Sequence, residues 1–365
     1  MNKFYYSLGL MSGTSMDGVD ASIIQSDGEK KYKVILDKYF EYPQGIYKDL
    51  IKLRDKIENS EDLKKFSKEI VEIEKEITLF HAKVSVEIIK KSKVNIDFIG
   101  FHGQTIFHNA KEKISKQLGD GKLLSNLTNR TVVYNFRQND LKNGGEGAPL
   151  TPVFHQMLEK KFNIKPVSFI NMGGILNRTT ILDDGELFAK DEGPGMCLID
   201  KWIRTNSKKK YDANGDIAKS GKVNKIILDQ YFDNFKSSSP EQKSYDTNDF
   251  DISFVKGLSL EDGAATLTYY TANILIAFLS ANEKLKIKEK IILCGGGRKN
   301  KFLVDIIKDH NKEIKLIDDY GIDGDFVESQ AFAYLAIRSY LKLPISFPET
   351  TGVKKPSTGG VLFKN

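Results

Sequence analysis

Residues 9–20 are Gly9-Leu10-Met11-Ser12-Gly13-Thr14-Ser15-Met16-Asp17-Gly18-Val19-Asp20, and the prediction of the fold starts from them. The apolar run Phe4–Leu10 before the turn and Val19–Ile24 after it predict two strands of a hairpin. Glycines and hydroxyls in such a turn leave backbone N–H groups open to phosphate oxygens. The GxxxxGK[ST] pattern is absent, so this is not a Walker loop. Taken alone, the turn is equally compatible with a structural hairpin.

The same arrangement occurs a second time in the chain. Val167–Asn171 predicts a strand, Met172-Gly173-Gly174 a turn and Asn177–Leu182 a second strand. Because each copy is followed by strands and helices in similar order, the sequence predicts two related α/β halves. The length of 365 residues also fits two domains of ordinary size.

Hydrophobic periodicity places the other elements. Apolar residues three and four apart predict one long helix at Glu61–Lys93. Pro149 and Pro152 suit the first turn of a following helix, Lys236–Asp251 is predicted to be a surface loop or lid, and the tail after Pro344 is predicted to be extended. The remaining predicted elements are strands at Val34–Tyr39, Asp97–Phe101, Thr131–Tyr134 and Lys290–Cys294, and helices at Met196–Arg204, Glu261–Asn282, Asn300–His310 and Asp325–Leu341.

Two further segments carry candidate chemistry. Gly295, Gly296 and Gly297 follow a predicted buried strand, and three glycines there permit close approach by a ligand, whereas a tight structural turn needs only one. Asp191 precedes the predicted helix at Met196–Arg204, where the helix N-terminus favours an ionised carboxylate that can accept a proton. N-capping is the structural alternative for Asp191. Two phosphate-type turns and a carboxylate together predict a phosphoryl-transfer site in a cleft between the domains.

Composition excludes several other classes of protein. The net charge of +6 comes from 55 Lys+Arg against 49 Asp+Glu without a clustered basic stripe, which argues against a nucleic-acid partner. Cys197 and Cys294 form no CxxC pair, so both are predicted to be buried core thiols. His102 and His108 are expected to form hydrogen bonds, since no third metal ligand is evident. We expect no signal peptide, no membrane partner and a cytoplasmic location.

The motifs resemble those of one known family. The segment from Gly9 to Asp20 is similar to the nucleotide signature of the anhydro-N-acetylmuramic acid kinases, which belong to the actin, sugar-kinase and heat-shock chaperone superfamily. The other matching segments are His102-Gly103-Gln104-Thr105 with His108, Phe136-Arg137 with Asp140, Gly144–Leu150, Asn171–Asn177, Asp191-Gly193-Pro194-Gly195 with Asp200, Cys294-Gly295-Gly296-Gly297 with Asn300, and Tyr320–Ala333.

The resemblance implies two ribonuclease-H-like α/β domains flanking a cleft, at residues 1–130 plus 343–365 and at 131–342. It implies an ATP-dependent, Mg²⁺-requiring enzyme that opens 1,6-anhydro-N-acetylmuramic acid with water and phosphorylates its O6. A homodimer is expected, because two-fold dimers are the commonest assemblies and the resemblance supports one. Asp191 matches the general base, and Asp17 is the expected metal ligand. The implied nucleotide-binding residues are Gly13, Thr14, Ser15, Met16, Asp17, Gly18, Val19, Asp20, Gly173, Gly174, Gly295, Gly296 and Gly297. The implied sugar-binding residues are His102, Gln104, Arg137, Gly147, Pro149 and Glu328.

The chain departs from the family pattern on the sugar side. The departures are Asn135, Glu146, Glu192, Met196 and the segment 243–249. A kinase of another anhydrosugar, such as levoglucosan, is therefore one alternative. An actin-like ATPase clamp without kinase activity is another, although the presence of Asp191 favours an enzyme.

Overall fold

Residues 3–238, 245–284 and 289–364 are described by the computed structural model, and they form two units. The first unit comprises Met1–Asn163 and Asp325–Asn365, and the second comprises Ile164–Gly324. These boundaries differ from the predicted 1–130 plus 343–365 and 131–342. The reason is that β6 (Thr131–Tyr134) pairs with β4 (Phe98–Asn109), and α12 (Val327–Tyr340) packs on β1 (Tyr5–Ser12), so both stay with the first sheet.

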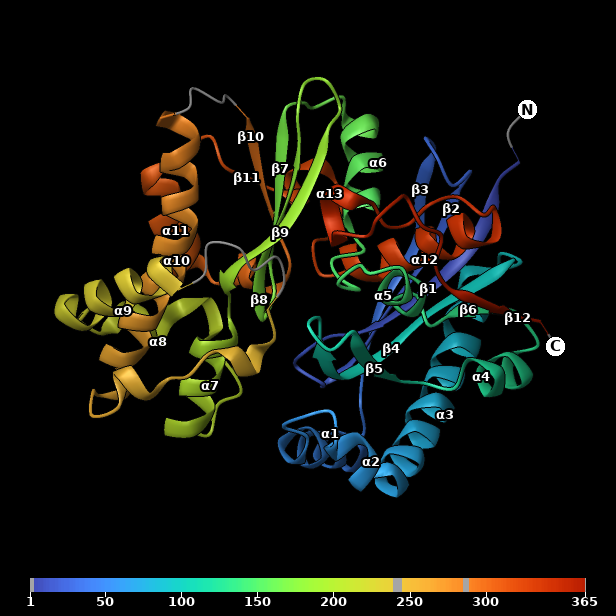
Figure 1. The fold of residues 1–365 in the computed structure, drawn as a ribbon, viewed down its shortest axis with the longest axis horizontal. Helices are drawn as coiled ribbons and strands as arrows, with labels where there is room; N and C mark the ends of the chain where they lie inside the picture. The colour runs from blue at the N-terminus through green and yellow to red at the C-terminus, as the bar shows by residue number, and fades with distance from the viewer. Residues whose placement is uncertain (1–2, 239–244, 285–288, 365) are drawn as a thin grey trace. The chain divides into compact units, whose positions relative to one another are not determined.

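The first unit is built on a seven-stranded sheet (Figure 1). Its order is β12-β6-β4-β1-β2-β3, and β5 pairs with β4 beside this path. The β1–β2 and β2–β3 pairs are antiparallel, whereas β4 runs parallel to β1 and β6 runs parallel to β4. The strands not yet given bounds are β2 (Gly18–Ser26), β3 (Tyr32–Glu41), β5 (Ile114–Leu118) and β12 (Val361–Phe363).

Helices cover both faces of this sheet. Leu8 and Leu10 share a core with the apolar stripe of α3 (Ser67–Ser92), whereas Gly9 between them faces α12, because side chains alternate along a strand. The other helices of this unit are α1 (Gln44–Lys56), α2 (Asp62–Lys65), α4 (Gly121–Thr128), α5 (Gln138–Lys142), α6 (Pro152–Phe162) and α13 (Pro348–Thr351).

The second unit has a five-stranded sheet in the order β11-β10-β7-β8-β9 (Figure 1). Its strands are β7 (Val167–Met172), β8 (Ile175–Ile181), β9 (Leu187–Pro194), β10 (Lys290–Cys294) and β11 (Lys315–Leu316). Its helices are α7 (Cys197–Asn206), α8 (Asp216–Ser220), α9 (Lys225–Ser238), α10 (Leu260–Lys284) and α11 (Lys301–His310). Trp202 of α7 and Leu267 of α10 share one buried core with Ile170 of β7.

The two sheets share one strand topology. In each, an antiparallel meander of three strands is extended by parallel strands beside its first member, namely β4 and β6 beside β1, and β10 and β11 beside β7. This agreement confirms the predicted fold class of two ribonuclease-H-like α/β units. It also confirms the prediction, made from the recurring strand–glycine turn–strand pattern, that the halves are related.

Three local predictions were wrong. The expected helix Glu61–Lys93 is interrupted at Phe66, whose φ of −99° and ψ of 19° lie outside the helical range and separate α2 from α3. Pro152 begins α6 as expected, but Pro149 lies before that helix and follows a cis peptide bond. The tail after Pro344 contains α13, so it is not wholly extended.

Other local predictions were met only in part. The expected loop Lys236–Asp251 includes the end of α9, and residues 239–244 lie outside the described part of the chain. Cys294 is buried and Cys197 is half-buried, and both are free thiols. Burial raises the pKa of Cys197 to about 12, so this thiol is neutral near pH 7. None of the helices among the described residues is long and apolar enough to span a membrane.

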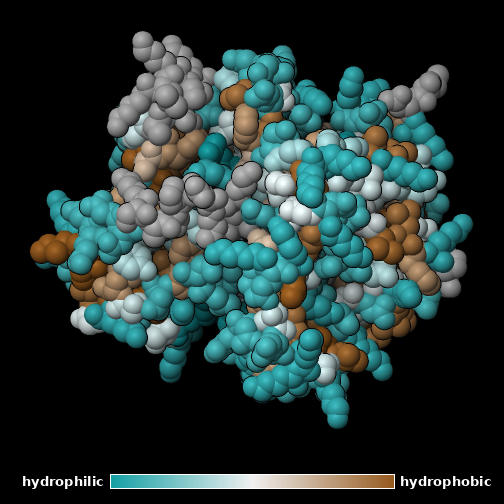
Figure 2. All heavy atoms as spheres, in the orientation of Figure 1, coloured by the Kyte–Doolittle hydropathy of each residue, from teal (hydrophilic) through white to brown (hydrophobic). Residues whose placement is uncertain are grey.

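The view in Figure 2 shows a largely hydrophilic surface on which apolar side chains form small separate groups. Large apolar residues with substantial exposure are scattered over many elements, from Val71 of α3 to Ile226 of α9. Scattered exposure of this kind is normal for a folded protein.

We expect Gly9→Ala to destabilise the first unit, because the new Cβ would lie 1.8 Å from the Ser329 carbonyl oxygen of α12. Moving the helix away from β1 costs about 1–3 kcal/mol for overpacking of this kind. Thermal unfolding measures the effect. Gly45→Ala in α1 is the matched control, since the described residues place nothing within 4 Å of its Cβ. Equal melting temperatures for the two variants would contradict the close approach.

Candidate functional site

The glycine and hydroxyl turn between β1 and β2 is closed by its own backbone. The Gly13 carbonyl accepts hydrogen bonds from the Met16 N–H, at 3.1 Å, and from Gln104 Nε2, at 3.0 Å. Met16 adopts a left-handed φ of 56° and is buried, so Thr14 and Ser15 are left exposed at the tip. The tip therefore presents hydroxyls and backbone without a bulky side chain, as the sequence predicts for a phosphate turn.

Asp17 is positioned at the end of this turn. Its Oδ1 accepts a hydrogen bond from the Ser15 hydroxyl at 2.6 Å, and its backbone carbonyl accepts one from the Tyr42 N–H at 2.8 Å. Burial and then the carboxylates of Asp17, Glu41 and Asp20 raise the pKa of Tyr39, which indicates a locally negative environment. The adjoining Val19 is buried in β2, and a Cβ on Gly18 would lie 2.5 Å from the Phe40 carbonyl oxygen, so these two residues support the turn.

A metal ion would depend on Asp17 and on ligand oxygens at this turn. The described residues contain no group of three or more His, Cys, Asp or Glu side chains able to hold a metal. Magnesium is commonly bound through one or two carboxylates together with phosphates and water, so the single carboxylate fits this metal better than a closed protein cage would.

A neutral hydrogen-bond chain lies beneath the turn. The Ser12 hydroxyl is 2.7 Å from the Tyr42 hydroxyl and 3.3 Å from His81 Nε2. His81 Nδ1 donates to the Ile77 carbonyl at 2.8 Å, so Nε2 of the neutral ring accepts. Burial lowers the pKa of His81 to about 4 and keeps this ring neutral. Tyr42 and His81 stand in no motif, and sequence reasoning missed both.

His102 and Arg137 of the predicted sugar-binding set contact each other. Nδ1 of His102 donates to the Gly103 carbonyl at 2.8 Å, and its Nε2 accepts from Arg137 Nη2 at 3.0 Å. Burial and then the Arg137 charge hold the pKa of His102 well below its usual range, so the ring is neutral. His102 is also the extra residue at a register shift between β1 and β4, a bulge of the kind that redirects a side chain.

Arg137 also connects this pair to the glycine segment before α6. Its Nη1 donates to the Gly147 carbonyl at 2.8 Å. The Gly147 N–H in turn donates to Asp140 Oδ2 at 2.7 Å, and Thr351 Oγ1 donates to Asp140 Oδ1 at 2.7 Å. Asp140 is buried, so the segment is anchored through a buried carboxylate whose two oxygens both accept hydrogen bonds. Asp140 therefore positions Gly147.

The other predicted sugar-binding residues are placed differently. Gln104 joins the phosphate turn through Gly13, and no partner for its buried Oε1 occurs among the described residues. Glu328 lies in the first turn of α12, one turn before Phe332, whose ring centroid is 4.4 Å from that of His102. Among the described residues, the structure brings His102, Arg137 and Gly147 together and Gln104 to the neighbouring turn, whereas no hydrogen bond joins Pro149 to this group.

In the second unit, the turn Gly173-Gly174 is bonded to the start of α7. The Gly173 carbonyl accepts from the Met196 N–H and the Gly174 carbonyl from the Gly195 N–H, both at 2.9 Å. A Cβ on Gly173 would find only ordinary contacts, the nearest at 3.5 Å. The turn is therefore fixed through its carbonyls while the space above Gly173 stays open. Met196, one of the departures from the family pattern, is the N-cap residue of α7.

The three glycines after β10 have different roles. Gly295 has a φ of 79°, and a Cβ there would lie 2.3 Å from Asn171 Oδ1. A Cβ on Gly297 would lie 2.8 Å from that of Met172. At Gly296 the described residues leave the Cβ position empty to 4 Å. Packing therefore requires two of these glycines, and Gly296 is the one at which a ligand can approach the backbone.

Arg298 fixes this loop and was missed by sequence reasoning. Its guanidinium makes two bonds to the Asp318 carboxylate, at 2.6 and 2.9 Å, and a third to Asp323 at 3.1 Å. A further bond from Nη1 reaches the Gly295 carbonyl at 3.1 Å. The Arg298 side chain is only 4% exposed. This bidentate pair joins the buried Arg298 to the exposed Asp318 side chain and holds the glycine loop against the 3₁₀ turn Ile317–Tyr320.

Asp191 lies in strand β9 and not at a helix N-terminus. The helix α7 begins later, at Cys197, and its N-cap is Met196, so both the predicted helix-dipole effect and the alternative of N-capping by Asp191 were wrong. Asp191 is 9% exposed, and its Oδ2 accepts the Tyr245 N–H at 2.8 Å. A register shift between β8 and β9 makes the next residue, Glu192, an extra residue beside Asp191.

Glu192 is engaged separately. Its carboxylate accepts from Arg178 Nε at 2.6 Å and lies 3.3 Å from Lys190 Nζ. Since Lys190 and Asp191 are adjacent in a strand, their side chains lie on opposite faces of the sheet. The two carboxylates at 191 and 192 therefore do not form one acidic pair. The remaining departures are Asn135, which adopts a φ of 57°, and Glu146, whose buried Oε2 has no hydrogen-bond partner among the described residues.

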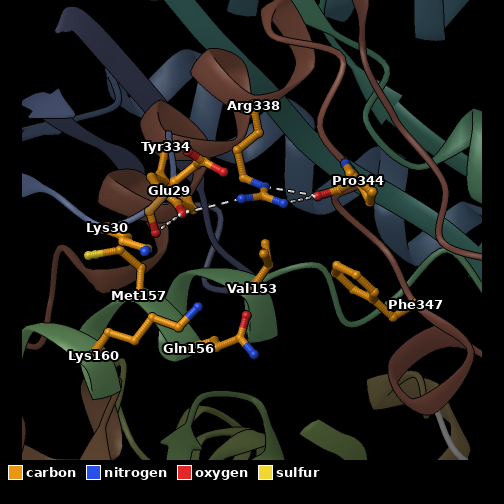
Figure 3. A pocket seen from close by; sticks show the side chains of 10 residues that line it. All are labelled: Glu29, Lys30, Val153, Gln156, Met157, Lys160, Tyr334, Arg338, Pro344 and Phe347. Atoms are coloured by element: carbon orange, nitrogen blue, oxygen red, sulfur yellow. Dashed lines mark hydrogen bonds between the residues drawn. The ribbon is translucent and has the colours of Figure 1, made fainter. Parts of the chain in front are cut away.

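A separate hollow of about 280 Å³ in the first unit contains none of the predicted site residues. Figure 3 shows Arg338 pointing across it to Pro344. The guanidinium donates to the Pro344 carbonyl, at 2.7 and 2.8 Å, and to the Gly28 carbonyl at 2.9 Å. Arg338 therefore holds two loops together at this hollow.

The chain matches the family model described as anhydro-N-acetylmuramic acid kinase over residues 5–365. The anhydro-N-acetylmuramic acid kinase of Pelagibacter ubique is 57% identical, with 100% of both chains covered. The protein of the same name from Agrobacterium fabrum is 36% identical, with 100% of both chains covered. The one from Zymomonas mobilis is 39% identical, with 97% of this chain and 98% of that chain covered.

The solved structures to which the chain is similar have much lower sequence identity to it. The activator of 2-hydroxyisocaproyl-CoA dehydratase from Clostridium difficile gives a TM-score of 0.42 at 11% identity, covering 91% of this chain and 94% of that chain. The hexokinase of Schistosoma mansoni gives 0.40 at 10% identity, covering 91% and 85%.

We expect Arg137→Gln to raise the pKa of His102, because the variant removes the cation beside Nε2. The pKa stays below the ordinary value, since burial is the larger cause of the shift. An NMR titration of the imidazole ring measures it. Arg130→Gln is the control, because the half-buried Arg130 side chain donates only to the carbonyl of Asn129 among the described residues. An unchanged His102 titration in the Arg137 variant would contradict the pairing.

Proposed function

Since the chain belongs to the anhydro-N-acetylmuramic acid kinase family, we propose that it is an ATP-dependent kinase of 1,6-anhydro-N-acetylmuramic acid. The products are N-acetylmuramic acid 6-phosphate and ADP, in the recycling of peptidoglycan amino sugars. The observation that carries the proposal is the placement of Asp191, a nearly buried carboxylate that accepts a backbone N–H. Such a hydrogen bond favours the ionised form that a general base needs.

Asp191 is the proposed general base. It takes a proton from a water molecule as the water oxygen bonds to the anomeric carbon of the anhydrosugar. The bond between that carbon and O6 breaks, and its electron pair stays on O6. This oxygen then bonds to the γ-phosphorus of ATP while the bond from phosphorus to the ADP oxygen breaks. One activated water thus serves both steps, provided that the reactants are held in line.

The proposed nucleotide contacts are the glycine turns of each unit. Gly13 and Gly173 have no close neighbour at the Cβ position, and Gly296 has open space there among the described residues. Exposed Thr14 and Ser15 add hydroxyl donors to backbone N–H groups. Open glycine backbone of this kind lets phosphate oxygens approach closely. We propose that Gly296 contacts the nucleotide directly, and that Gly295 and Gly297 mainly allow the close packing that holds Gly296 in place.

Magnesium fits the chemistry of Asp17, whose carboxylate is oriented by the Ser15 hydroxyl. When bound, Mg²⁺ would neutralise charge on the transferring phosphates. The protein's own part is to hold Asp17 at the end of the turn, since Tyr42 bonds its backbone and Ser15 its side chain.

The proposed sugar contacts are His102, Gln104, Arg137, Gly147, Pro149 and Glu328. Support comes from the contacts among His102, Arg137 and Gly147, and from the partnerless Gln104 Oε1 and Glu146 Oε2 among the described residues. Buried polar atoms without partners are costly, and a polyhydroxylated ligand supplies donors. We also propose a cytoplasmic homodimer, on the strength of the family resemblance.

We expect the purified protein to release ADP only when the anhydro-amino sugar is present, and Asp191→Asn to lower that turnover about 10²–10⁴-fold, as loss of a general base does. Nucleotide binding stays, because an asparagine oxygen can still accept the Tyr245 N–H. A coupled ADP-release assay over anhydro-N-acetylmuramic acid, levoglucosan and ordinary hexoses measures it. Asp183→Asn, at an exposed site in the same unit, is the control. Equal ATP turnover without sugar would exclude the kinase.

We expect Gly296→Ala to raise the KM for ATP about tenfold, the size of a 1.4 kcal/mol loss of binding. Its melting temperature stays unchanged, because the described residues leave the Cβ position empty. Gly297→Ala lowers the melting temperature instead, since its Cβ meets Met172. Steady-state kinetics and thermal unfolding of both variants separate the two roles. A normal KM with Gly296→Ala would remove Gly296 from the nucleotide site.

A further inference from the structure

We propose that the segment Tyr245–Phe250 is a positioning element for Asp191, which it acts on through the backbone N–H of Tyr245. The inference rests on the proposed function, since it concerns the proposed base. It assigns a role to residues within 243–249, the part of the chain that departs most from the family pattern. Tyr245 is a positioning residue, because it acts on the reacting groups through Asp191.

The contact itself is direct. The Tyr245 N–H donates to Asp191 Oδ2 at 2.8 Å, across 54 residues of sequence. Hydrogen bonds that involve a charged group are worth about 1.5–3 kcal/mol. A bond of this kind fixes the direction of the carboxylate as well as favouring its ionised form. The backbone conformation at Tyr245 therefore affects both the orientation and the ionisation of the proposed base, Asp191.

An aromatic cluster holds Tyr245 in place. Its ring centroid lies 5.2 Å from that of Phe250 and 6.3 Å from that of Phe235 in α9. Phe235 also contacts β9, because a Cβ on Gly193 would lie 2.7 Å from Phe235 Cζ. Phe250 and Phe235 are themselves 6.3 Å apart. The three rings thus connect Tyr245 to strand β9 at Gly193, which lies two residues after Asp191 in the sequence.

A capping box sets the backbone that follows Tyr245. The Asp246 N–H donates to Asp249 Oδ2 at 2.8 Å, and Asp246 Oδ1 accepts from the Asn248 N–H at 2.9 Å. These bonds close the 3₁₀ turn Thr247–Asp249 between the two aromatic residues. Asp249 is exposed, so the box can be opened without touching the core. A specific turn geometry, and not only apolar burial, therefore presents the N–H.

Four elements supply the groups described around Asp191, and three of them carry charged side chains. Lys190 and Glu192 on β9, with Arg178 on β8, form an ion-paired group, and Lys190 lies on the opposite face from Asp191. Asn177 is the register partner of Asp191 on β8. On the positioning segment the carboxylates are Asp246 and Asp249. From α10, uncharged Thr271 and Ile274 approach Gly195 and Gly193.

The test compares full-length Asp249→Ala, Asp249→Asn and Phe250→Ala proteins in the sugar-dependent ADP-release assay. Opening the box or removing the ring lets the Tyr245 N–H move away from Asp191. We expect kcat to fall about tenfold in Asp249→Ala and in Phe250→Ala. The acid limb of the pH–rate profile moves to higher pH, because the ionised base has lost a donor. The KM for ATP stays unchanged, and Asp249→Asn, which keeps an acceptor, restores much of the rate.

Phe254→Leu is the matched control for the aromatic cluster. The Phe254 ring stacks on that of Tyr231, with centroids 3.6 Å apart, and lies edge-on to Tyr270, whereas the ring neighbours of Tyr245 described above are Phe235 and Phe250. Its profile keeps the wild-type acid limb, even where its melting temperature falls. A wild-type acid limb in both Asp249→Ala and Phe250→Ala would overturn the positioning role while leaving the kinase intact. Wild-type protein without sugar-dependent ADP release would instead overturn the proposed function and this inference with it.

Discussion

The close approach of α12 to the first sheet is the constraint on which the rest of that unit depends. Gly9 on β1 and Gly100 on β4 leave no room for a side chain, because backbone carbonyls of α12 occupy the Cβ positions at 1.8 and 2.2 Å. The buried hydroxyls of Ser22 and Ser329 meet at 2.6 Å in the same layer. This packing places the Phe332 ring against His102 and sets the position of Glu328 in the first turn of the helix. The same helix thus packs against the sheet and positions two of the proposed sugar contacts, Glu328 and His102.

In both units, candidate functional residues lie at or beside β-bulges in otherwise regular strands. His102 is an extra residue at a register shift of β4, and Glu192 is an extra residue beside Asp191 in β9. Bulges bend a strand and redirect its side chains, so the same sheets that build the core present polar groups at their ends. Around these points the polar side chains are paired in an ordered way, as with Arg137 to His102 and Arg178 to Glu192.

Much of the fold could be predicted from the sequence, because hydrophobic alternation and glycine turns mark strands locally. The strand Thr131–Tyr134 and the strand Lys290–Cys294 have the predicted bounds. The break at Phe66 could not be predicted, since no glycine or proline marks it. The bounds of the two units differ from the predicted domains for a similar reason, because the pairing of β6 with β4 is a long-range contact without a local signal.

The candidate site divides in the same way. Motif residues such as Gly13, Asp17 and Asp191 could be proposed from the sequence, because glycines and carboxylates in turns have recognisable chemistry. Tyr42, His81, Arg298 and Tyr245 could not, since each acts through a partner distant in sequence. The setting of Asp191 was also misjudged, because a strand that continues through Pro194 cannot be distinguished by composition from a helix start.

The chain of Tyr42, Ser12 and His81 beneath the phosphate turn has a consequence for how an anion is held. These three side chains are uncharged, since burial keeps His81 in its neutral form. If the turn binds a triphosphate as proposed, hydrogen-bond dipoles and the bound counter-ion would hold it, because Ser12, Tyr42 and His81 supply no positive charge. Such a seat discriminates by shape more than by charge. It would also release a spent nucleotide readily, because no buried cation would have to be left unpaired when the anion departs.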